Sequence, residues 1–206
     1  MGETKASIRT AALKRRDSLS ATDREQKSRL IQSHAVAFPL YTDSPAVALY
    51  SAAGSEVATD LVRDHALGAG KELFYPSLAP DGALRWIRCR PGAGFVRGRY
   101  GILEPSGTEY LTTTDGLAVF VPGVAFDVRG ERLGRGQGWY DRAIASLGDN
   151  VCTIGLAYEL QLVERVPTDS WDRRVQYLIT EGRIVDCRDW PRASGVPETL
   201  SMKRGC

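Results

Sequence analysis

The sequence has almost no excess charge of one sign and no long apolar run. Its 206 residues include 27 lysines and arginines and 25 acidic residues, for a formal net charge of +2. So small a surplus argues against a nucleic-acid partner, and the local clustering of arginine is more informative than the total. No run approaches membrane-spanning length, and residues 1–20 lack the apolar core of a signal peptide. We therefore expect a cytoplasmic protein with neither a nucleic-acid nor a membrane partner.

Cysteine pairs and internal repeats are also missing. The chain contains four scattered cysteines, which are Cys89, Cys152, Cys187 and Cys206. Without a C-x-x-C pair, they fit a reduced protein better than a disulfide scaffold or a zinc site. The chain shows no long linker, and its length suits one domain with a sizeable core. We expect residues 1–206 to form a single domain, with residues 182–206 as an irregular tail.

Glycine and arginine are concentrated between residues 119 and 142, after an apolar run that predicts a buried strand over residues 117–121. The stretch contains Gly130, Gly134, Gly136, Gly138, Arg129, Arg132 and Arg135. Closely spaced glycines let backbone N–H groups converge on an anion, and a helix predicted over residues 139–147 adds the free N–H groups of its first turn. Arginines supply forked donors for phosphate oxygens. The stretch predicts a phosphate-binding loop, although a glycine-rich hairpin with solvated arginines remains an alternative.

This loop does not match the two standard nucleotide motifs. A P-loop ends in Gly-Lys-Ser/Thr, whereas this loop ends in Gly138-Trp139-Tyr140. The Rossmann fingerprint would need a third glycine where Trp139 stands. Any nucleotide must therefore be held in another way.

Short apolar runs alternate with helical patterns along the chain. Helices are expected over residues 5–18 and 139–147. Another should begin at a capping box formed by Thr22 and Glu25 and end at Pro39, and a fourth should begin at the N-cap Thr59 and run to residue 68. Strands are expected over residues 47–51, 71–75 (ended by Pro76), 84–89 near an edge, 117–121, 151–157 and 177–180, with a mobile loop over residues 91–98. This alternation predicts an α/β domain with a mostly parallel sheet, whose ligands bind beyond the carboxyl ends of the strands.

The run P-G-V-A-F-D-x-x-G-x-R-L-G-x-G-x-G-W-Y-D-R, over residues 122–142, closely resembles the signature of the 5-formyltetrahydrofolate cyclo-ligase family. Weaker matches extend from Lys5 to about Thr180. The resemblance implies a single three-layer domain similar to sugar-phosphate isomerases and CoA transferases. It also implies a monomeric, ATP-dependent ligase that closes a C–N ring bond. Members use ATP and Mg²⁺ to convert 5-formyltetrahydrofolate into 5,10-methenyltetrahydrofolate, releasing ADP and phosphate.

The resemblance also assigns residues to ATP and to the metal. K-A-S-I-R matches the family's phosphate-contacting Lys-x-x-x-Arg pair, although a basic stripe on a helix can also be a solvated face. The implied ATP-binding residues are Lys5, Arg9, Arg132, Leu133, Gly134, Arg135, Gly136, Gln137, Gly138, Trp139 and Tyr140, of which Arg132, Arg135 and Tyr140 would serve catalysis. Asp141 and Asp172 would hold Mg²⁺, although an acid in the first turn of a helix also favours the helix dipole without a metal.

The implied folate-binding residues are Ala52, Glu56, Ala58, Tyr100 and Trp139. In the loop that contains Glu56, the family often reads Gly-Glu-Val-Asp/Glu-Thr. This chain reads G-S-E-V-A-T over residues 54–59 and has alanine, Ala58, at the usual acidic position. Gln176 is a second departure from the family's pattern. Two other hypotheses therefore remain open, namely an ATP-dependent paralogue with another substrate and a non-catalytic folate- or nucleotide-binding regulator.

The reaction implied by the resemblance begins when the formyl oxygen takes the γ-phosphoryl group of ATP. N10 then attacks the activated carbon and phosphate leaves. Phosphoryl transfer asks a protein mainly for positioning and charge neutralisation. Loop N–H groups, cationic side chains and two aspartates fit this demand, and no nucleophile–base pair is needed.

Overall fold

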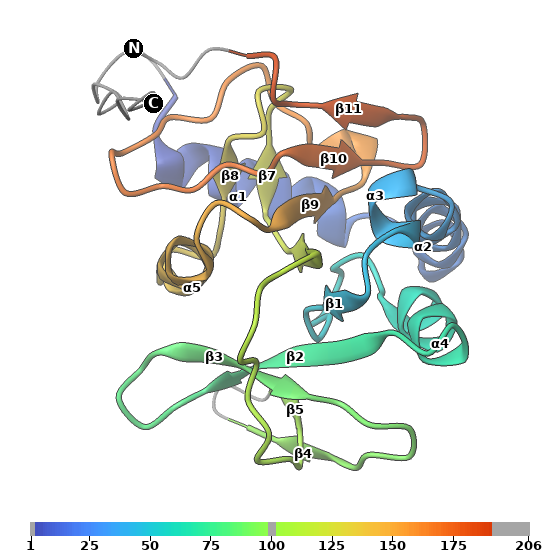
Figure 1. The fold of residues 1–206 in the computed structure, drawn as a ribbon. Helices are drawn as coiled ribbons and strands as arrows, with labels where there is room; N and C mark the ends of the chain where they lie inside the picture. Colours follow the sequence, from blue (N-terminus) through green and yellow to red (C-terminus); the bar gives the residue numbers. More distant parts are fainter. Residues whose placement is uncertain (1–2, 99–101, 191–206) are drawn as a thin grey trace, which may run out of the picture.

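The computed structural model describes residues 3–98 and 102–190, which fold around a seven-stranded sheet (Figure 1). Its strands are β1 (Ala46–Ala48), β2 (Glu72–Leu78), β3 (Leu84–Arg88), β6 (Leu117–Val121), β9 (Cys152–Leu156), β10 (Tyr177–Ile179) and β11 (Ile184–Asp186). The spatial order is β11-β10-β9-β6-β1-β2-β3. The five central strands are parallel, and the edge strands β3 and β11 are antiparallel to their neighbours. The predicted α/β class with a mostly parallel sheet is confirmed.

Helices cover both faces of this sheet. They are α1 (Lys5–Asp17), α2 (Ala21–Val36), α3 (Pro39–Thr42), α4 (Asp60–Gly68), α5 (Trp139–Leu147) and the 3-10 helix η2 (Glu159–Gln161). Helices α2, α3 and α4 pack on one face, where Ile31, Tyr41 and Val62 meet the buried strand residues (Figure 1). Helix α5 packs on the other through Ile144 and Leu147. The result is a three-layer arrangement, and no helix of the described residues is long and apolar enough to span a membrane.

Two small hairpins complete the fold and shape the site. Strands β7 (Ala125–Phe126) and β8 (Arg132–Leu133) pair in one, and β4 (Phe95–Arg97) pairs with β5 (Leu103–Pro105) in the other. Helix α1 packs on the β7–β8 hairpin through Ile8 and Ala12, which lie in one buried cluster with Val124 and Leu133. The N-terminal helix is thereby fixed beside the glycine-rich stretch that follows β8.

The structure corrects the predicted effect of Pro76, which lies within β2 and does not end it. The Cys89 N–H donates to the Leu73 carbonyl at 2.7 Å, so these two residues form a hydrogen-bonded pair between the segments of β2 and β3. Along an antiparallel pair of strands, residue pairs that exchange hydrogen bonds alternate with pairs that do not. Counting from the Leu73–Cys89 pair, Pro76 and Trp86 form a pair that exchanges no hydrogen bonds. A proline has no N–H to lose there, and β2 continues to Leu78.

Several predicted helix signals act differently in the structure. Ser20, and not Thr22, is the N-cap of α2, and its hydroxyl accepts from the Asp23 N–H at 3.0 Å. Helix α2 ends at Val36, and Pro39 begins α3, where its fixed φ suits a first helical position. Thr59 occupies the N-cap position of α4, but its hydroxyl donates to the Tyr50 carbonyl at 3.0 Å and makes no capping bond.

Two segments predicted as irregular contain strands. Residues 91–98, predicted as a mobile loop, include β4. The predicted C-terminal tail includes β11, so β10 is not the last strand of the sheet. Both strands are only three residues long and largely exposed, and such short segments lack the apolar alternation that marks a strand in sequence.

Candidate active site

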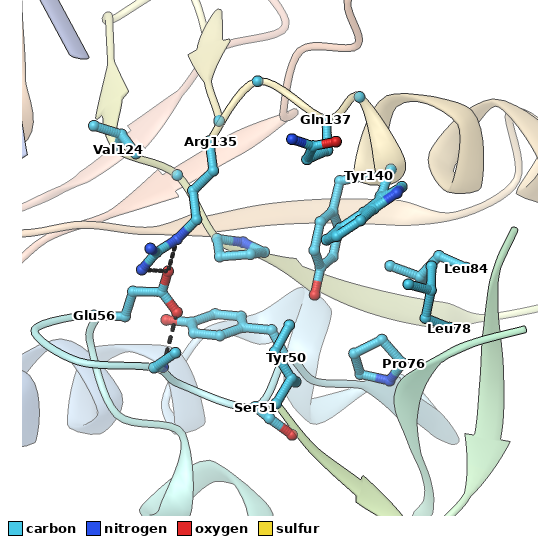
Figure 2. A pocket seen from close by; sticks show the side chains of 18 of the residues that line it. Tyr50, Ser51, Glu56, Pro76, Leu78, Leu84, Val124, Arg135, Gln137 and Tyr140 are labelled. Atoms are coloured by element: carbon cyan, nitrogen blue, oxygen red, sulfur yellow. Dashed lines mark hydrogen bonds and ion pairs between the residues drawn. The ribbon is translucent and has the colours of Figure 1, made fainter. Parts of the chain in front are cut away.

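A cavity of about 350 Å³ opens beyond the carboxyl ends of β1, β2 and β6 (Figure 2). The residues after β1 form one wall, the glycine loop over residues 134–138 forms a second, and side chains from β2 and β3 form a third. The lining residues are Tyr50, Ser51, Ala53, Glu56, Pro76, Leu78, Leu84, Ile102, Glu104, Pro122, Gly123, Val124, Arg132, Gly134, Arg135, Gly136, Gln137, Gly138, Trp139 and Tyr140. This is the edge where open α/β sheets bind their ligands.

The glycine loop depends on backbone conformations that other residues rarely adopt. Gly136 has φ of 100°, and Gly138, the N-cap of α5, has φ of 65°. The loop is also held from outside, because the Arg9 Nε of α1 donates to the Gly134 carbonyl at 2.9 Å. A Cβ built on Gly136 would lie 3.6 Å from Arg9 Nη2, so the guanidinium lies directly beside the loop. The loop therefore joins the start of a helix to a nearby cation, as an anion site requires.

Arg132 is a buried cation in the wall of this cavity. Its side chain is only 3% exposed, and its Nη2 donates to Asp141 Oδ1 at 2.6 Å. The same carboxylate oxygen accepts from the Arg173 N–H at 3.0 Å. The Arg132 Nε is buried without a hydrogen-bond partner among the described residues. An unsatisfied buried donor is costly, so this guanidinium has capacity for an anionic ligand.

Lys5 binds the segment that carries the second predicted metal ligand. Its Nζ lies 2.5 Å from Asp172 Oδ2 and 2.7 Å from Asp169 Oδ2. Burial acts to lower the pKa of Lys5, but hydrogen bonds and charge attraction from both aspartates outweigh it and raise that pKa above its ordinary value. Lys5 is thereby kept charged and fixed beside Asp172.

Asp141 and Asp172 lie near each other, because the Arg173 N–H that binds Asp141 belongs to the next residue after Asp172. Each carboxylate has a cation in this structure, Arg132 for Asp141 and Lys5 for Asp172. The described residues contain no group of three or more acidic, histidine or cysteine side chains that could hold a metal by themselves. One or two carboxylates suffice for Mg²⁺ when phosphate oxygens and water supply the remaining ligands, so the donor set fits a metal that arrives with a phosphate.

Glu56 and Arg135 meet across the mouth of the cavity (Figure 2). Arg135 Nη2 lies 3.2 Å from Glu56 Oε1, and Glu56 Oε2 accepts from the Ala53 N–H at 3.0 Å. The Glu56 side chain is 11% exposed, whereas that of Arg135 is 58% exposed. Glu56 is therefore the fixed member of the pair, and Arg135 is the member that can turn toward a ligand.

Tyr140 extends its side chain into the cavity from the first turn of α5 (Figure 2). Burial, and then the negative charge of Glu56, raise the pKa of the Tyr140 hydroxyl well above its ordinary value, although Arg132 opposes this. The hydroxyl therefore remains protonated at neutral pH. It can donate a hydrogen bond but cannot act as a base.

Some predicted site residues lie outside the cavity lining. The predicted site residues that are described but do not line it are Lys5, Arg9, Ala52, Ala58, Leu133, Asp141 and Asp172. The Ala58 N–H donates to Ser28 Oγ at 2.8 Å. Leu133 is buried against α1 and can contribute only its backbone. Tyr100 lies outside the described residues.

The apolar wall of the cavity was not predicted. Pro76, Leu78 and Leu84 come from β2 and β3, and their inward positions depend on how these strands pair. Tyr50, also in the lining, is fixed by a 2.7 Å hydrogen bond from its hydroxyl to the Val57 carbonyl. No motif marks these residues in the sequence; the position of Tyr50 at the end of a predicted strand was the one available signal.

Fold and site together define an α/β protein with a cationic glycine loop beside a partly apolar cavity. The model of the 5-formyltetrahydrofolate cyclo-ligase family matches residues 1–181, and this chain belongs to that family. The family is one of ligases, so the chain is an enzyme of this class. The resemblance found in the glycine-rich signature is confirmed.

Curated relatives and solved structures agree with this assignment. The chain is 31% identical over 170 residues to the 5-formyltetrahydrofolate cyclo-ligase of Haemophilus influenzae, covering 80% of this chain and 91% of that protein. It is 27% identical over 206 residues to the mouse enzyme of the same name, covering 88% of this chain and 95% of that protein. The NMR structure of Aquifex aeolicus 5,10-methenyltetrahydrofolate synthetase superposes with a TM-score of 0.80 at 32% identity, covering 96% and 99% of the two chains.

Proposed function

We propose that this protein cyclises 5-formyltetrahydrofolate to 5,10-methenyltetrahydrofolate in a reaction that consumes ATP and requires Mg²⁺. The observation that carries this proposal is that one cavity has a cationic side and an apolar side. One is a cationic glycine loop with the buried Arg132, and the other is an apolar wall from β2 and β3 beside the carboxylate of Glu56. A phosphate donor and an apolar heterocycle with polar edges could therefore meet in one place, as phosphoryl transfer between them requires.

The phosphates of ATP would bind on the glycine-loop side. Arg132 offers a buried donor without a partner, and Lys5 and Arg9 approach the same region from α1. Backbone N–H groups at the start of α5 would add to this binding. Arg132 and Arg135 would neutralise the charge that spreads over the transferred phosphoryl group, which is the main demand of this chemistry.

Asp141 and Asp172 would hold the magnesium ion. When bound with ATP, Mg²⁺ supplies charge neutralisation on the phosphate oxygens. The two aspartates would share their charge between the metal and their present partners, Arg132 and Lys5. This arrangement supports a site that is completed only when the nucleotide arrives.

The folate would lie against the apolar wall, with its pterin edge toward Glu56. A pterin presents a ring N–H beside an exocyclic amine, and one carboxylate can accept from both. Glu56 lines the cavity and Ala58 does not, which supports Glu56 as the acceptor despite the missing acid at position 58. Trp139 and Tyr140 would cover the reacting groups and exclude water, with the Tyr140 hydroxyl as a protonated hydrogen-bond donor.

The test is formation of the methenyl product, followed by its absorbance. Purified protein is mixed with 5-formyltetrahydrofolate, ATP and Mg²⁺, and each component is omitted in turn. We expect product only in the complete mixture, with ADP and phosphate released in equal amounts. ATP consumption with another substrate and no methenyl product would instead identify a paralogue, and tight folate or nucleotide binding without turnover would identify a regulator.

The matched variants for this assay are Arg132→Met and Arg29→Met. Arg132 is buried in the cavity wall, whereas Arg29 lies on α2 with a side chain 73% exposed. We expect turnover to be lost in the first variant and retained in the second. Equal turnover in both would contradict the role given to Arg132.

A further inference from the structure

Helix α1 presents three cations on one face toward the active site. Lys5, Arg9 and Arg16 are separated by four and then seven residues, which returns each to the same side of a helix. They span about 16 Å along the axis at ~1.5 Å per residue. Arg9 contacts the glycine loop and Lys5 contacts Asp172, and both have a part in the proposed reaction, whereas Arg16 has none.

Arg16 is fully buried and joins two loops that line the cavity. The residue is 2% exposed. Its Nε donates to Ser55 Oγ at 2.9 Å, and its Nη1 donates to the Gly123 carbonyl at 3.4 Å. Ser55 in turn donates a short hydrogen bond to Asp17, so both residues at the end of α1 hold the loop that follows β1. Ser55 immediately precedes Glu56, and Gly123 lies in the loop after β6.

Arg16 also lies within the electrostatic reach of Glu56. Burial lowers the pKa of Arg16, and the strongest opposing influence is the carboxylate of Glu56. A buried cation without a compensating charge is strongly destabilising, so the negative charge of Glu56 helps to offset the burial of Arg16. Arg135 forms a direct ion pair with Glu56 and is the more exposed member of that pair.

We propose that Arg16 is a positioning residue for Glu56. It holds the loop that carries Glu56 against the cavity, and it supplies the buried positive charge that Glu56 keeps when Arg135 turns toward the phosphates. This inference rests on the proposed function, in which Glu56 binds the folate and Arg135 binds ATP. Helix α1 thus serves both ligands, with Lys5 and Arg9 on the nucleotide side and Arg16 on the folate side.

The experiment compares steady-state kinetics for both substrates in four single variants and one double variant. Arg16→Met removes the charge and the donors, Arg16→Lys restores the charge alone, and Ser55→Ala removes the acceptor from the loop side. Arg15→Met is the control, because Arg15 is the exposed neighbour on the same helix. In Arg16→Met we expect the KM for 5-formyltetrahydrofolate to rise about tenfold, which corresponds to about 1.4 kcal/mol, with the KM for ATP within about twofold of the parent.

Arg16→Lys should recover part of this loss, and Ser55→Ala should raise the folate KM in the same direction by a smaller factor. The double variant Arg16→Met/Ser55→Ala should have a folate KM below the product of the two separate effects, because both changes remove the same Arg16–Ser55 hydrogen bond. If Arg16→Met does not fold, the folate KM and the ATP KM of Ser55→Ala test the positioning role instead. An unchanged folate KM, or equal rises in the KM for folate and for ATP, would overturn the positioning role.

Failure of this inference can be told apart from failure of the proposed function. If the parent protein forms no methenyl product, the proposed function fails. Calorimetric titration of 5-formyltetrahydrofolate into the parent, Arg16→Met and Arg15→Met then tests Arg16 by itself. Weaker binding in Arg16→Met alone supports the positioning role, and equal binding or no binding in all three overturns it.

Discussion

Replacing Asp141 with asparagine tests the buried ion pair and the proposed metal site together. Asp141→Asn keeps an oxygen that can accept from Arg132 and from the Arg173 N–H, but it removes the negative charge. The Arg132 side chain is 3% exposed and that of Asp141 is 15% exposed, so the lost charge is poorly replaced by solvent. Removing one partner of a buried pair costs about 3–5 kcal/mol.

The retained hydrogen bonds place the expected cost at or below the lower limit of that range. We expect the free energy of unfolding to fall by about 2–3 kcal/mol, because a neutral acceptor still satisfies the Arg132 donor. For a chain of this length, ~1 kcal/mol corresponds to ~2–4 °C, so the melting temperature should fall by about 4–12 °C. Asp149→Asn is the control, since Asp149 is exposed after α5, and it should leave the melting temperature unchanged within about 1 °C.

Nucleotide binding should then separate the two roles of Asp141. Without Mg²⁺, a non-hydrolysable ATP analogue should raise the melting temperature of Asp141→Asn more than that of the parent, because no carboxylate repels the phosphates beside Arg132. With Mg²⁺, turnover by Asp141→Asn should remain far below that of the parent, because a metal ligand has been lost. Thermal unfolding and the methenyl absorbance assay measure these effects. Parent-like turnover at saturating Mg²⁺ and ATP, with a lowered melting temperature, would show that Asp141 serves the fold alone.

Three further predictions concern other groups of the site and the core. Arg9→Met should weaken binding of a non-hydrolysable ATP analogue by about 1.5–3 kcal/mol in calorimetric titration, the range for a hydrogen bond to a charged group, and an unaltered affinity would contradict the phosphate role. Glu56→Ala should raise the KM for 5-formyltetrahydrofolate and leave the KM for ATP little changed; equal KM values in variant and parent would remove Glu56 from the folate site. Burial raises the pKa of Cys152 to about 11 and that of Cys187 to about 12, so both remain thiols at pH 8 and become reactive only as the pH rises toward these values. In a Cys206→Ser variant, Cys152 and Cys187 should therefore react slowly with a thiol reagent until the chain is unfolded. Rapid labelling of either cysteine in the folded protein would refute this.

The local patterns of the sequence predicted the elements around the glycine loop with their observed bounds. The strand over residues 117–121 and the helix over residues 139–147 both occur where expected. The reason is physical: a continuous apolar run fits only a buried strand in this setting, and the left-handed backbone of Gly136 and Gly138 is open to glycine but not to most other residues. Features with a weak local signal, such as the short strands β4 and β11, were missed.

The α/β class and the family thus followed from the sequence, because each is encoded within a short stretch or a repeating pattern, and the phosphate role of the glycine loop stays a prediction. The partners of the charged groups did not. Lys5 meets Asp172 across 167 positions, and Arg135 meets Glu56 across 79. The apolar wall of the cavity depends on the register between β2 and β3, and the burial of Arg16 depends on α1 packing beside two distant loops. These features arise only when the sheet brings separate segments to one edge, so the tertiary structure alone decided which cation pairs with which carboxylate and which side chains line the cavity.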